Sequence, residues 1–164
     1  MKLEIRAMTA KDWEHVRAIY LAGIATGQAT FETECADWAK WNATHLPAPR
    51  LVAISEGKIV GWAALSAVSG RAVYAGVAEV SVYVDAEQRG KGVGSSLLEA
   101  LVKESELNGI WTLQASIFPE NTASTSLHKS CGFRELGRRE RIGRRNGVWR
   151  DTLLFERRSK LVGI

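Results

Sequence analysis

The sequence predicts an α/β protein with one mixed central β-sheet of about six to seven strands, flanked by about four helices. Two observations carry this prediction. Apolar residues repeat at helical spacing in some segments, whereas in others they alternate or run unbroken over only a few residues. The two kinds of segment are interleaved along the chain and are separated by glycine, proline or Asn-Gly. Interleaving of this kind is typical of helices that pack on the faces of one sheet.

The N-terminal segments predict a strand and then two helices. Residues 1–6 alternate polar and apolar, as a strand does, and Thr9-x-x-Asp12 resembles a capping box. Helical spacing of apolar residues follows over 13–24. Trp38 and Trp41, three residues apart, predict a short second helix before two prolines stop it.

The remaining segments complete the order β-α-α-β-β-β-α-β-α-β-β. A turn at Gly57 joins the strands at 51–54 and 59–65 into a hairpin. Asn146-Gly147 is a strong hairpin turn and joins the last two strands of the chain. In chain order we expect strands at 51–54, 59–65 and 78–84, a helix at 97–107, a strand at 111–117, a helix at 121–130, and strands on either side of Asn146-Gly147.

Length and composition indicate one globular domain, 1–164. With 46% hydrophobic and 24% charged residues, the chain resembles ordinary globular proteins, and no apolar run reaches the ~18 residues of a membrane span. Residues 1–6 lack the apolar stretch of a signal peptide, so we expect a cytoplasmic protein without a membrane partner. Cys35 and Cys131 have no metal-binding spacing, so we expect no metal.

Arginines are concentrated near the C-terminus. Such a cluster can meet nucleic acid, an anionic cofactor or solvent. Because it flanks the Asn146-Gly147 turn, we interpret most of it as the exposed face of a hairpin and expect no nucleic-acid partner. The seven arginines are Arg134, Arg138, Arg139, Arg141, Arg144, Arg145 and Arg150.

A glycine-rich turn joins the strand at 78–84 to the following helix. It reads Gln88-Arg89-Gly90-Lys91-Gly92-Val93-Gly94-Ser95. Glycines allow positive φ, and the free N–H groups of a helix N-terminus attract anions, so the turn suits a pyrophosphate. Gly92 stands where a Walker loop needs its hydroxyl residue, and Ser95 stands where a dinucleotide fingerprint needs its third glycine. A solvated turn with no ligand is the alternative.

A second motif lies one helix and one strand further on. Residues 121–133 read Asn-Thr-Ala-Ser-Thr-Ser-Leu-His-Lys-Ser-Cys-Gly-Phe. The glycine turn resembles the Gln/Arg-x-x-Gly-x-Gly/Ala loop of the GNAT superfamily of acyl-CoA N-acetyltransferases. The second motif resembles that superfamily's Asn-x-x-Ala-x-x-Leu-Tyr-x-x-x-Gly-Phe helix. The two motifs stand in the superfamily's order, and the resemblance covers essentially the whole chain.

Details beyond these motifs are similar to one group within the superfamily, the phosphinothricin and methionine sulfoximine acetyltransferases. They are residues 29–33, Glu79-x-Ser81-Val82-Tyr83-Val84, residues 146–151, and His128 in place of the usual tyrosine. The resemblance implies transfer of an acetyl group from acetyl-CoA to the α-amine of a small amino acid or analogue. It also implies a homodimer, for which the arginine-rich hairpin with Trp149 is a candidate edge.

The resemblance implies which residues hold acetyl-CoA. The backbone at the strand end pairs with the pantetheine amides, the glycine turn holds the pyrophosphate, and Asn121 meets the pantetheine arm. The implied cofactor-binding residues are Val82, Tyr83, Val84, Arg89, Gly90, Lys91, Gly92, Val93, Gly94, Ser95 and Asn121.

Two residues are candidates for proton transfer. Glu79 shares a strand face with Ser81 and Tyr83, and we expect it to accept the amine's proton directly or through a water. His128 stands where the superfamily's tyrosine protonates the departing thiolate, and we expect it to act as general acid. The alternatives are a solvated or ion-paired strand glutamate and a packing histidine.

Two loops offer candidate acceptor contacts: Phe31 and Glu32 after the first helix, and Arg71 and Tyr74 before the strand at 78–84. Arg71 beside the two glutamates favours a zwitterionic amino acid over a polyamine. Other hypotheses stay open: acetylation of a polyamine or a protein N-terminus, and a non-catalytic acyl-CoA-binding module. Retention of both Glu79 and His128 argues against the non-catalytic module.

Overall fold

A computed structural model describes residues 2–164 and contains seven strands and four α-helices. Three short 3₁₀ turns, at Ala10–Asp12, Ala72–Tyr74 and Ala86–Gln88, connect them. In chain order the elements are β1 (Leu3–Ala7), α1 (Trp13–Ala25), α2 (Trp38–Thr44), β2 (Arg50–Ser55), β3 (Lys58–Ala67), β4 (Val77–Val84), α3 (Val93–Leu107), β5 (Thr112–Ile117), α4 (Thr122–Ser130), β6 (Arg134–Arg145) and β7 (Val148–Arg158).

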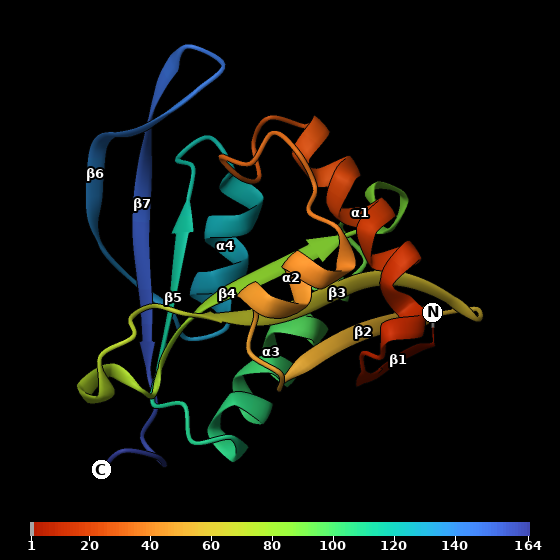
Figure 1. The fold of residues 1–164 in the computed structure, drawn as a ribbon, viewed down its shortest axis with the longest axis horizontal. Helices are drawn as coiled ribbons and strands as arrows, with labels where there is room; N and C mark the ends of the chain where they lie inside the picture. The colour runs from red at the N-terminus through yellow and green to blue at the C-terminus, as the bar shows by residue number, and fades with distance from the viewer. Residues whose placement is uncertain (1) are drawn as a thin grey trace.

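The strands form one sheet in the order β1-β2-β3-β4-β5-β7-β6. Strands β4 and β5 pair in parallel, and the other neighbours pair antiparallel. In Figure 1, α1 and α2 lie in front of the sheet and α3 lies behind it. The predicted fold class, a mixed sheet flanked by about four helices, is confirmed.

Each face of the sheet has its own core. On one face, leucines of α3 pack against the alternate residues Leu65, Val80 and Leu113 of the central strands. On the other face, Trp13, Val16 and Ile19 of α1 pack with Trp41 of α2 on Trp62 of β3. Because side chains alternate along β4, Val80 belongs to the first face, and Glu79, Ser81 and Tyr83 belong to the α1–α2 face.

Strands β4 and β5 pair over only part of their length. Their parallel register runs from Val77–Thr112 to Glu79–Gln114 and then stops, although β4 continues to Val84 and β5 to Ile117. Figure 1 shows the two arrows diverging beyond this point. The sheet therefore has an opening in its middle, and side chains from its two faces can meet there.

Several boundaries differ from those the sequence predicts. Helix α3 begins at Val93 and not at Leu97, because Gly92 adopts φ 82° and turns the chain directly into the helix. Val93, Gly94 and Ser95 therefore belong to its first turn. Strand β5 begins after Trp111, whose ring lies so close to Gly76 that a Cβ there would be 2.1 Å away.

The predicted capping box is formed, and Arg6 joins it by binding the Asp12 carboxylate. The Asp12 carboxylate accepts the Thr9 N–H at 2.8 Å and also two hydrogen bonds from the Arg6 guanidinium, at 2.8 and 2.9 Å. Chiefly through these Arg6 bonds, the pKa of Asp12 falls from 3.8 to about 2. The pair fixes β1 to the start of α1.

We expect Asp12→Asn to lower the free energy of unfolding by about 1 to 2 kcal/mol at pH 7. Because the folded pKa of Asp12 is depressed, its contribution is complete above the unfolded value of 3.8 and is lost as pH falls towards 2. Urea unfolding of both proteins at pH 7 and pH 3 tests this, and the deficit should shrink to about half at pH 3. An equal deficit at the two pH values would contradict it.

Within residues 2–164, none of the helices combines the length and the apolar character that a membrane crossing requires.

Candidate active site

A cavity of about 240 Å³ occupies the opening between β4 and β5. Glu79 reaches it from β4 and His128 reaches it from α4, on the other face of the sheet. The two residues that the sequence selects for proton transfer therefore line one cavity. Its wall comprises Ala29, Thr30, Phe31, Glu79, Val80, Ser81, Val82, Tyr83, Ala115, Ser116, Ile117, Phe118, Asn121, Ser124, His128 and Thr152.

Glu79 is half-buried in the middle of the sheet. Its neighbours across the register are Ser66 on β3 and Gln114 on β5, both uncharged. None of the ion pairs formed within the described chain involves Glu79. Within the described chain, no ion pair therefore occupies the Glu79 carboxylate.

His128 is 5% exposed and packs edge-on against Phe133, with ring centroids 5.1 Å apart. Its Nδ1 lies 2.7 Å from the Ser124 carbonyl oxygen, which only accepts hydrogen bonds, so Nδ1 carries the proton and donates. The lone pair of the neutral ring is therefore on Nε2. Burial lowers the pKa of His128 below 6.5, so the ring is neutral at neutral pH.

A groove of about 470 Å³ adjoins this cavity and follows the glycine turn. The two share Ala29, Val82, Tyr83, Asn121 and Ser124, so they form one continuous depression. The groove is lined by Gly23, Thr26, Gln28, Ala29, Val82, Tyr83, Val84, Gln88, Arg89, Gly90, Gly92, Val93, Gly94, Ser95, Asn121, Ala123, Ser124 and Leu127. Of the predicted cofactor-binding residues, Lys91 is absent from this lining and is exposed.

The groove offers backbone groups suited to an acyl-CoA. Gly90 and Gly92 have φ of 75° and 82°, and Gly92 is the N-cap of α3, whose first N–H groups attract phosphate. Beyond Glu79, the edge of β4 that faces β5 has no strand partner in the described part of the chain. The N–H and C=O groups of 80–84 on that edge can therefore bond amides of an extended ligand.

Tyr83 forms the floor where the cavity and the groove meet. Its ring stacks on Trp62 with centroids 5.0 Å apart, and Tyr20 packs against it at 5.0 Å. Helix α1 approaches this ring so closely that a Cβ at Gly23 would lie 2.7 Å from it. Burial raises the pKa of Tyr83, so its phenol stays neutral.

The predicted acceptor residues separate into two sets. Phe31 lines the cavity and packs edge-on against Phe118, with ring centroids 4.9 Å apart. Glu32, Arg71 and Tyr74 are exposed and are not part of the cavity wall, and the Arg71 guanidinium lies 5.6 Å from the centre of the Tyr74 ring. Trp149, which the sequence analysis places at a dimer edge, is 55% exposed on the hairpin.

Sequence reasoning missed several lining residues. Phe118 directly follows β5, and Thr152 lies within β7. Ala29 and Thr30 follow α1 in an irregular segment and belong to the 29–33 stretch that carries the family resemblance, although no site role was predicted for them. Phe118 and Thr152 belong to no motif, so no signal in the chain identifies them. Ser124 stands within the second motif, on the face of α4 that carries His128 one turn later.

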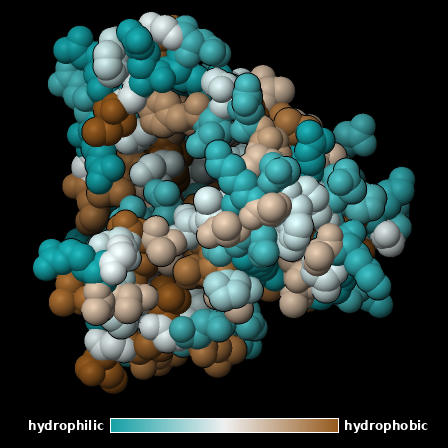
Figure 2. Space-filling model, in the orientation of Figure 1, coloured by the Kyte–Doolittle hydropathy of each residue, from teal (hydrophilic) through white to brown (hydrophobic). Residues whose placement is uncertain are grey.

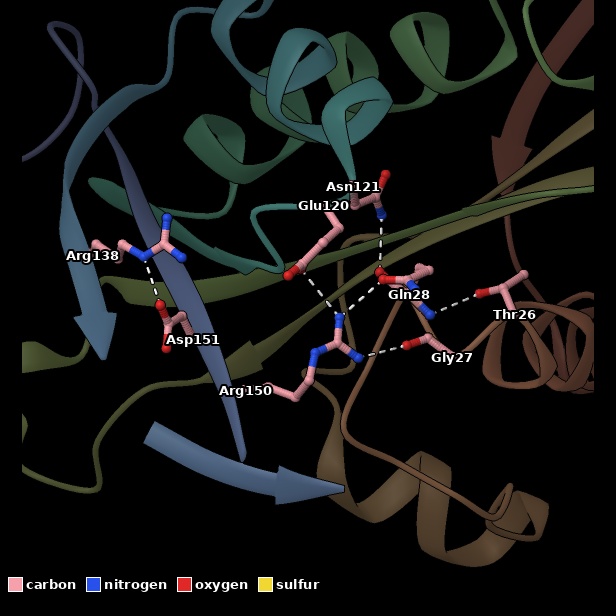
Figure 3. A network of polar contacts seen from close by, with 8 residues as sticks. All are labelled: Thr26, Gly27, Gln28, Glu120, Asn121, Arg138, Arg150 and Asp151. Carbon is pink, nitrogen blue, oxygen red and sulfur yellow. Dashed lines mark hydrogen bonds and ion pairs between the residues drawn. The ribbon is translucent and has the colours of Figure 1, made fainter. Parts of the chain in front are cut away.

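Two arginines of the β6–β7 hairpin are partly buried, unlike the rest of the arginine cluster. Most of the arginine cluster is solvated, as predicted, but Arg145 and Arg150 bind the end of α1 and the segment after it. Arg145 donates to the Ile24 carbonyl oxygen at 2.9 Å, and Arg150 donates to that of Gly27 at 3.0 Å. Figure 3 shows Arg150 reaching from β7 to this segment. Within residues 2–164, no group of three His, Cys, Asp or Glu side chains is arranged to hold a metal ion.

Comparison with known proteins shows which family this chain belongs to. The family model described as Acetyltransferase (GNAT) family matches residues 10–133. The chain is 34% identical to a phosphinothricin N-acetyltransferase of Alcaligenes faecalis over 160 residues, which cover 93% of this chain and 81% of the relative. It is 32% identical to an L-methionine sulfoximine/L-methionine sulfone acetyltransferase of Pseudomonas aeruginosa over 162 residues, 95% of this chain and 94% of the relative.

A solved structure agrees over nearly the full length. A GNAT superfamily phosphinothricin acetyltransferase from Sinorhizobium meliloti, in complex with AcCoA, superposes with a TM-score of 0.88 at 29% identity, covering 99% of this chain and 91% of that one. The chain belongs to the GNAT acetyltransferase family, and it is an acetyl-CoA-dependent N-acetyltransferase. The residues that line the groove fit acetyl-CoA as its co-substrate.

Proposed function

We propose that residues 1–164 form a single acetyltransferase domain that moves the acetyl group of acetyl-CoA to the α-amine of a small amino acid or analogue of the methionine sulfoximine or phosphinothricin type. The names of the relatives at 32% and 34% identity support this acceptor class. The small cavity supports it too, since about 240 Å³ suits a single amino acid better than a peptide.

One observation carries the proposal: Glu79 and His128, from opposite faces of the sheet, line the cavity that continues into the groove of the glycine turn. Acetyl-CoA in the groove brings its thioester to the junction, beside Tyr83 and Ser124. An amine in the cavity then meets the thioester carbonyl between a proton acceptor and an imidazole. Proximity of this kind supplies a large part of the rate enhancement.

In the proposed reaction the acceptor's ammonium group first gives a proton to the Glu79 carboxylate, directly or through a water. The free amine nitrogen attacks the thioester carbonyl carbon and forms a C–N bond and a tetrahedral intermediate. The C–S bond then breaks, the nitrogen loses its second proton, and the sulfur takes one. The products are the N-acetylated acceptor, CoA thiol and one proton released to solvent.

His128 serves the last step as general acid. Because its ring is neutral before turnover and its Nδ1–H is held by the Ser124 carbonyl oxygen, only Nε2 can exchange protons. Nε2 therefore takes the second proton of the attacking nitrogen and passes it to the sulfur. The histidine is a base and then an acid within one turnover.

We expect His128→Asn to lower kcat by about tenfold, because a thiolate of pKa ~8.5 leaves fairly well without protonation. Asparagine keeps a donor for the Ser124 carbonyl oxygen, so α4 should stay intact. Steady-state CoA release at saturating acetyl-CoA measures the effect. A kcat unchanged within twofold would show that His128 only packs against Phe133.

An amino-acid acceptor carries an α-carboxylate, which needs a cationic side chain to bind it. We propose Arg71 for the α-carboxylate, with Tyr74 beside it, while Phe31 walls the cavity and Glu32 orders the loop that carries Phe31. A guanidinium pairs with a carboxylate through two parallel hydrogen bonds, which selects a zwitterion. If Arg71→Ala leaves the acceptor KM unchanged, the carboxylate is held elsewhere.

A cytoplasmic homodimer is part of the proposal, and the chain has two candidate surfaces for it: the hairpin that carries the exposed Trp149, and an apolar patch elsewhere. Figure 2 shows apolar side chains gathered at the lower left, where Figure 1 places the loop between β3 and β4 and the C-terminal end. That loop and end carry the exposed Val73, Tyr74, Leu161 and Ile164. Large exposed apolar patches mark interfaces. Sedimentation velocity of the full chain tests the dimer, and a monomer at micromolar concentration would remove it.

The test of function follows CoA release from acetyl-CoA with L-methionine sulfoximine, L-phosphinothricin and spermidine as separate acceptors. We expect turnover with the first two and little with the third. Turnover with spermidine alone would replace the amino acid by a polyamine. Silence with all three, together with measurable acetyl-CoA binding by calorimetry, would support a non-catalytic acyl-CoA-binding module.

A further inference from the structure

The segment that follows α1 closes both depressions. Residues 26–31, here named the strap, contribute Ala29, Thr30 and Phe31 to the cavity and Thr26, Gln28 and Ala29 to the groove. The strap contains no helix or strand. Its position therefore depends on contacts with other parts of the chain.

Side chains from distant segments provide those contacts. Asn121 Nδ2 donates to the Gln28 carbonyl oxygen at 3.2 Å, and its Oδ1 accepts from the Ser124 N–H at the start of α4. On the other side, Arg150 donates to the Gly27 carbonyl oxygen at 3.0 Å and to Gln28 Oε1 at 2.9 Å. The strap is thus held between α4 and β7, as Figure 3 shows.

Arg150 also binds the segment that joins β5 to α4. Its Nη2 lies 3.2 Å from the Glu120 carboxylate, and its guanidinium lies 4.0 Å from the centre of the Phe118 ring. Phe118 in turn packs against Phe31 of the strap. The Arg150 side chain is only 15% exposed, whereas its partner Glu120 is 58% exposed, so the guanidinium is held mainly within the protein.

We propose that Arg150 is a positioning residue for acceptor binding: it fixes the strap and the Phe31–Phe118 wall of the cavity without touching the reacting groups. The proposal rests on the proposed function for its kinetic consequences, but the position of the strap can be measured without any acceptor. Arginine suits the role because its planar fork donates in several directions at once, whereas lysine presents a single point charge.

A second contact supports the same wall from β6. A Cβ at Gly143 would lie 2.8 Å from the Phe31 ring, so this strand leaves space only for a bare backbone. The hairpin β6–β7 thus sets the position of Phe31 through Gly143 and that of Phe118 through Arg150. Arg150 thus belongs to the arginine cluster of the hairpin, but it binds the strap and the segment between β5 and α4.

The experiment compares Arg150→Gln with Arg134→Gln. Arg134 is the matched control because it lies on the same hairpin and pairs with Glu156 at 2.8 Å, far along the sheet from the strap. Hydrogen–deuterium exchange of the peptide that covers 24–35 is measured in wild type and both variants, without ligand. Loss of hydrogen bonds from a charged donor should speed exchange there about tenfold in Arg150→Gln only.

Kinetics then separate positioning from a general structural role. Arg150→Gln should raise the acceptor KM about tenfold and leave kcat within about threefold, because Arg150 contacts neither Glu79 nor His128. Gly143→Ala should raise the acceptor KM as well, since Phe31 must move, while exchange at Ile24–Gly27 stays unchanged. Arg150→Lys should fall between wild type and Arg150→Gln.

Unchanged exchange in Arg150→Gln, or equal acceleration in Arg134→Gln, would overturn the proposal. So would a loss confined to kcat. If wild type acetylates none of the acceptors offered, the proposed function fails, and the exchange measurement alone decides whether Arg150 holds the strap.

Discussion

Glu79→Gln is expected to lower kcat by between about a hundredfold and ten-thousandfold, the usual range for loss of a general base. Glutamine keeps the size of the side chain, and the flanking Ser66 and Gln114 are uncharged, so the sheet should tolerate the change. The carboxamide does not accept a proton at neutral pH. The acceptor's ammonium group then has no base beside it, while the groove for acetyl-CoA is intact.

Two readouts separate this loss from misfolding. Calorimetry should give an acetyl-CoA affinity within about threefold of wild type, and the matched substitution Glu4→Gln, on the edge strand β1, should leave kcat unchanged. The deficit of Glu79→Gln should also shrink as pH rises, because a free amine needs no base. A deficit that is constant with pH would mean that Glu79 orients the acceptor and does not take its proton.

The second large effect is expected in the glycine turn. The double substitution Gly90→Ala/Gly92→Ala should weaken acetyl-CoA binding by between about tenfold and a hundredfold. A Cβ at either position meets nothing within 4 Å, so steric conflict is not the reason. The reason is backbone conformation, since φ of 75° and 82° costs an L-residue about 1 to 2 kcal/mol. A relaxed turn would no longer aim its N–H groups at the pyrophosphate.

Gly57→Ala is the matched control, because Gly57 has φ 75°, also has open space around it, and lies in the turn between β2 and β3. It carries the same strain far from the groove, so it should lower stability without changing affinity for acetyl-CoA. Calorimetric titration with acetyl-CoA measures both variants. Equal affinity in the double variant and wild type would mean that side chains such as Arg89, and not the backbone, hold the phosphates.

The order and type of the elements could be predicted from the chain because the signals are local. Helical spacing in 13–24, alternation in 78–84 and the Asn146-Gly147 turn each report the conformation of their own residues. The boundaries were less accurate where contacts from elsewhere decide them. Trp111, for example, lies just outside β5, where its ring packs on Gly76.

The site was predicted to the extent that motifs describe it. Glu79, His128 and most residues of the glycine turn line the predicted depression, because each belongs to a pattern of residue types at fixed spacing. Glu32, Arg71 and Tyr74 do not line it, since the loops that carry them have no periodicity to fix their course. Which arginines of the cluster turn away from solvent, as Arg150 does, could not be predicted, because charge clustering does not report the direction of a side chain.

The sequence by itself determined the family, the succession of helices and strands, and the positions where only glycine gives the required backbone, because these follow from neighbours along the chain. Only the tertiary structure decided that β4 and β5 part after Glu79, that Glu79 and His128 meet through the opening, and that Arg150 holds the strap. These features depend on the number of residues over which β4 and β5 pair and on the groups that the Arg150 side chain reaches. Both are set by packing between segments that lie far apart in the sequence.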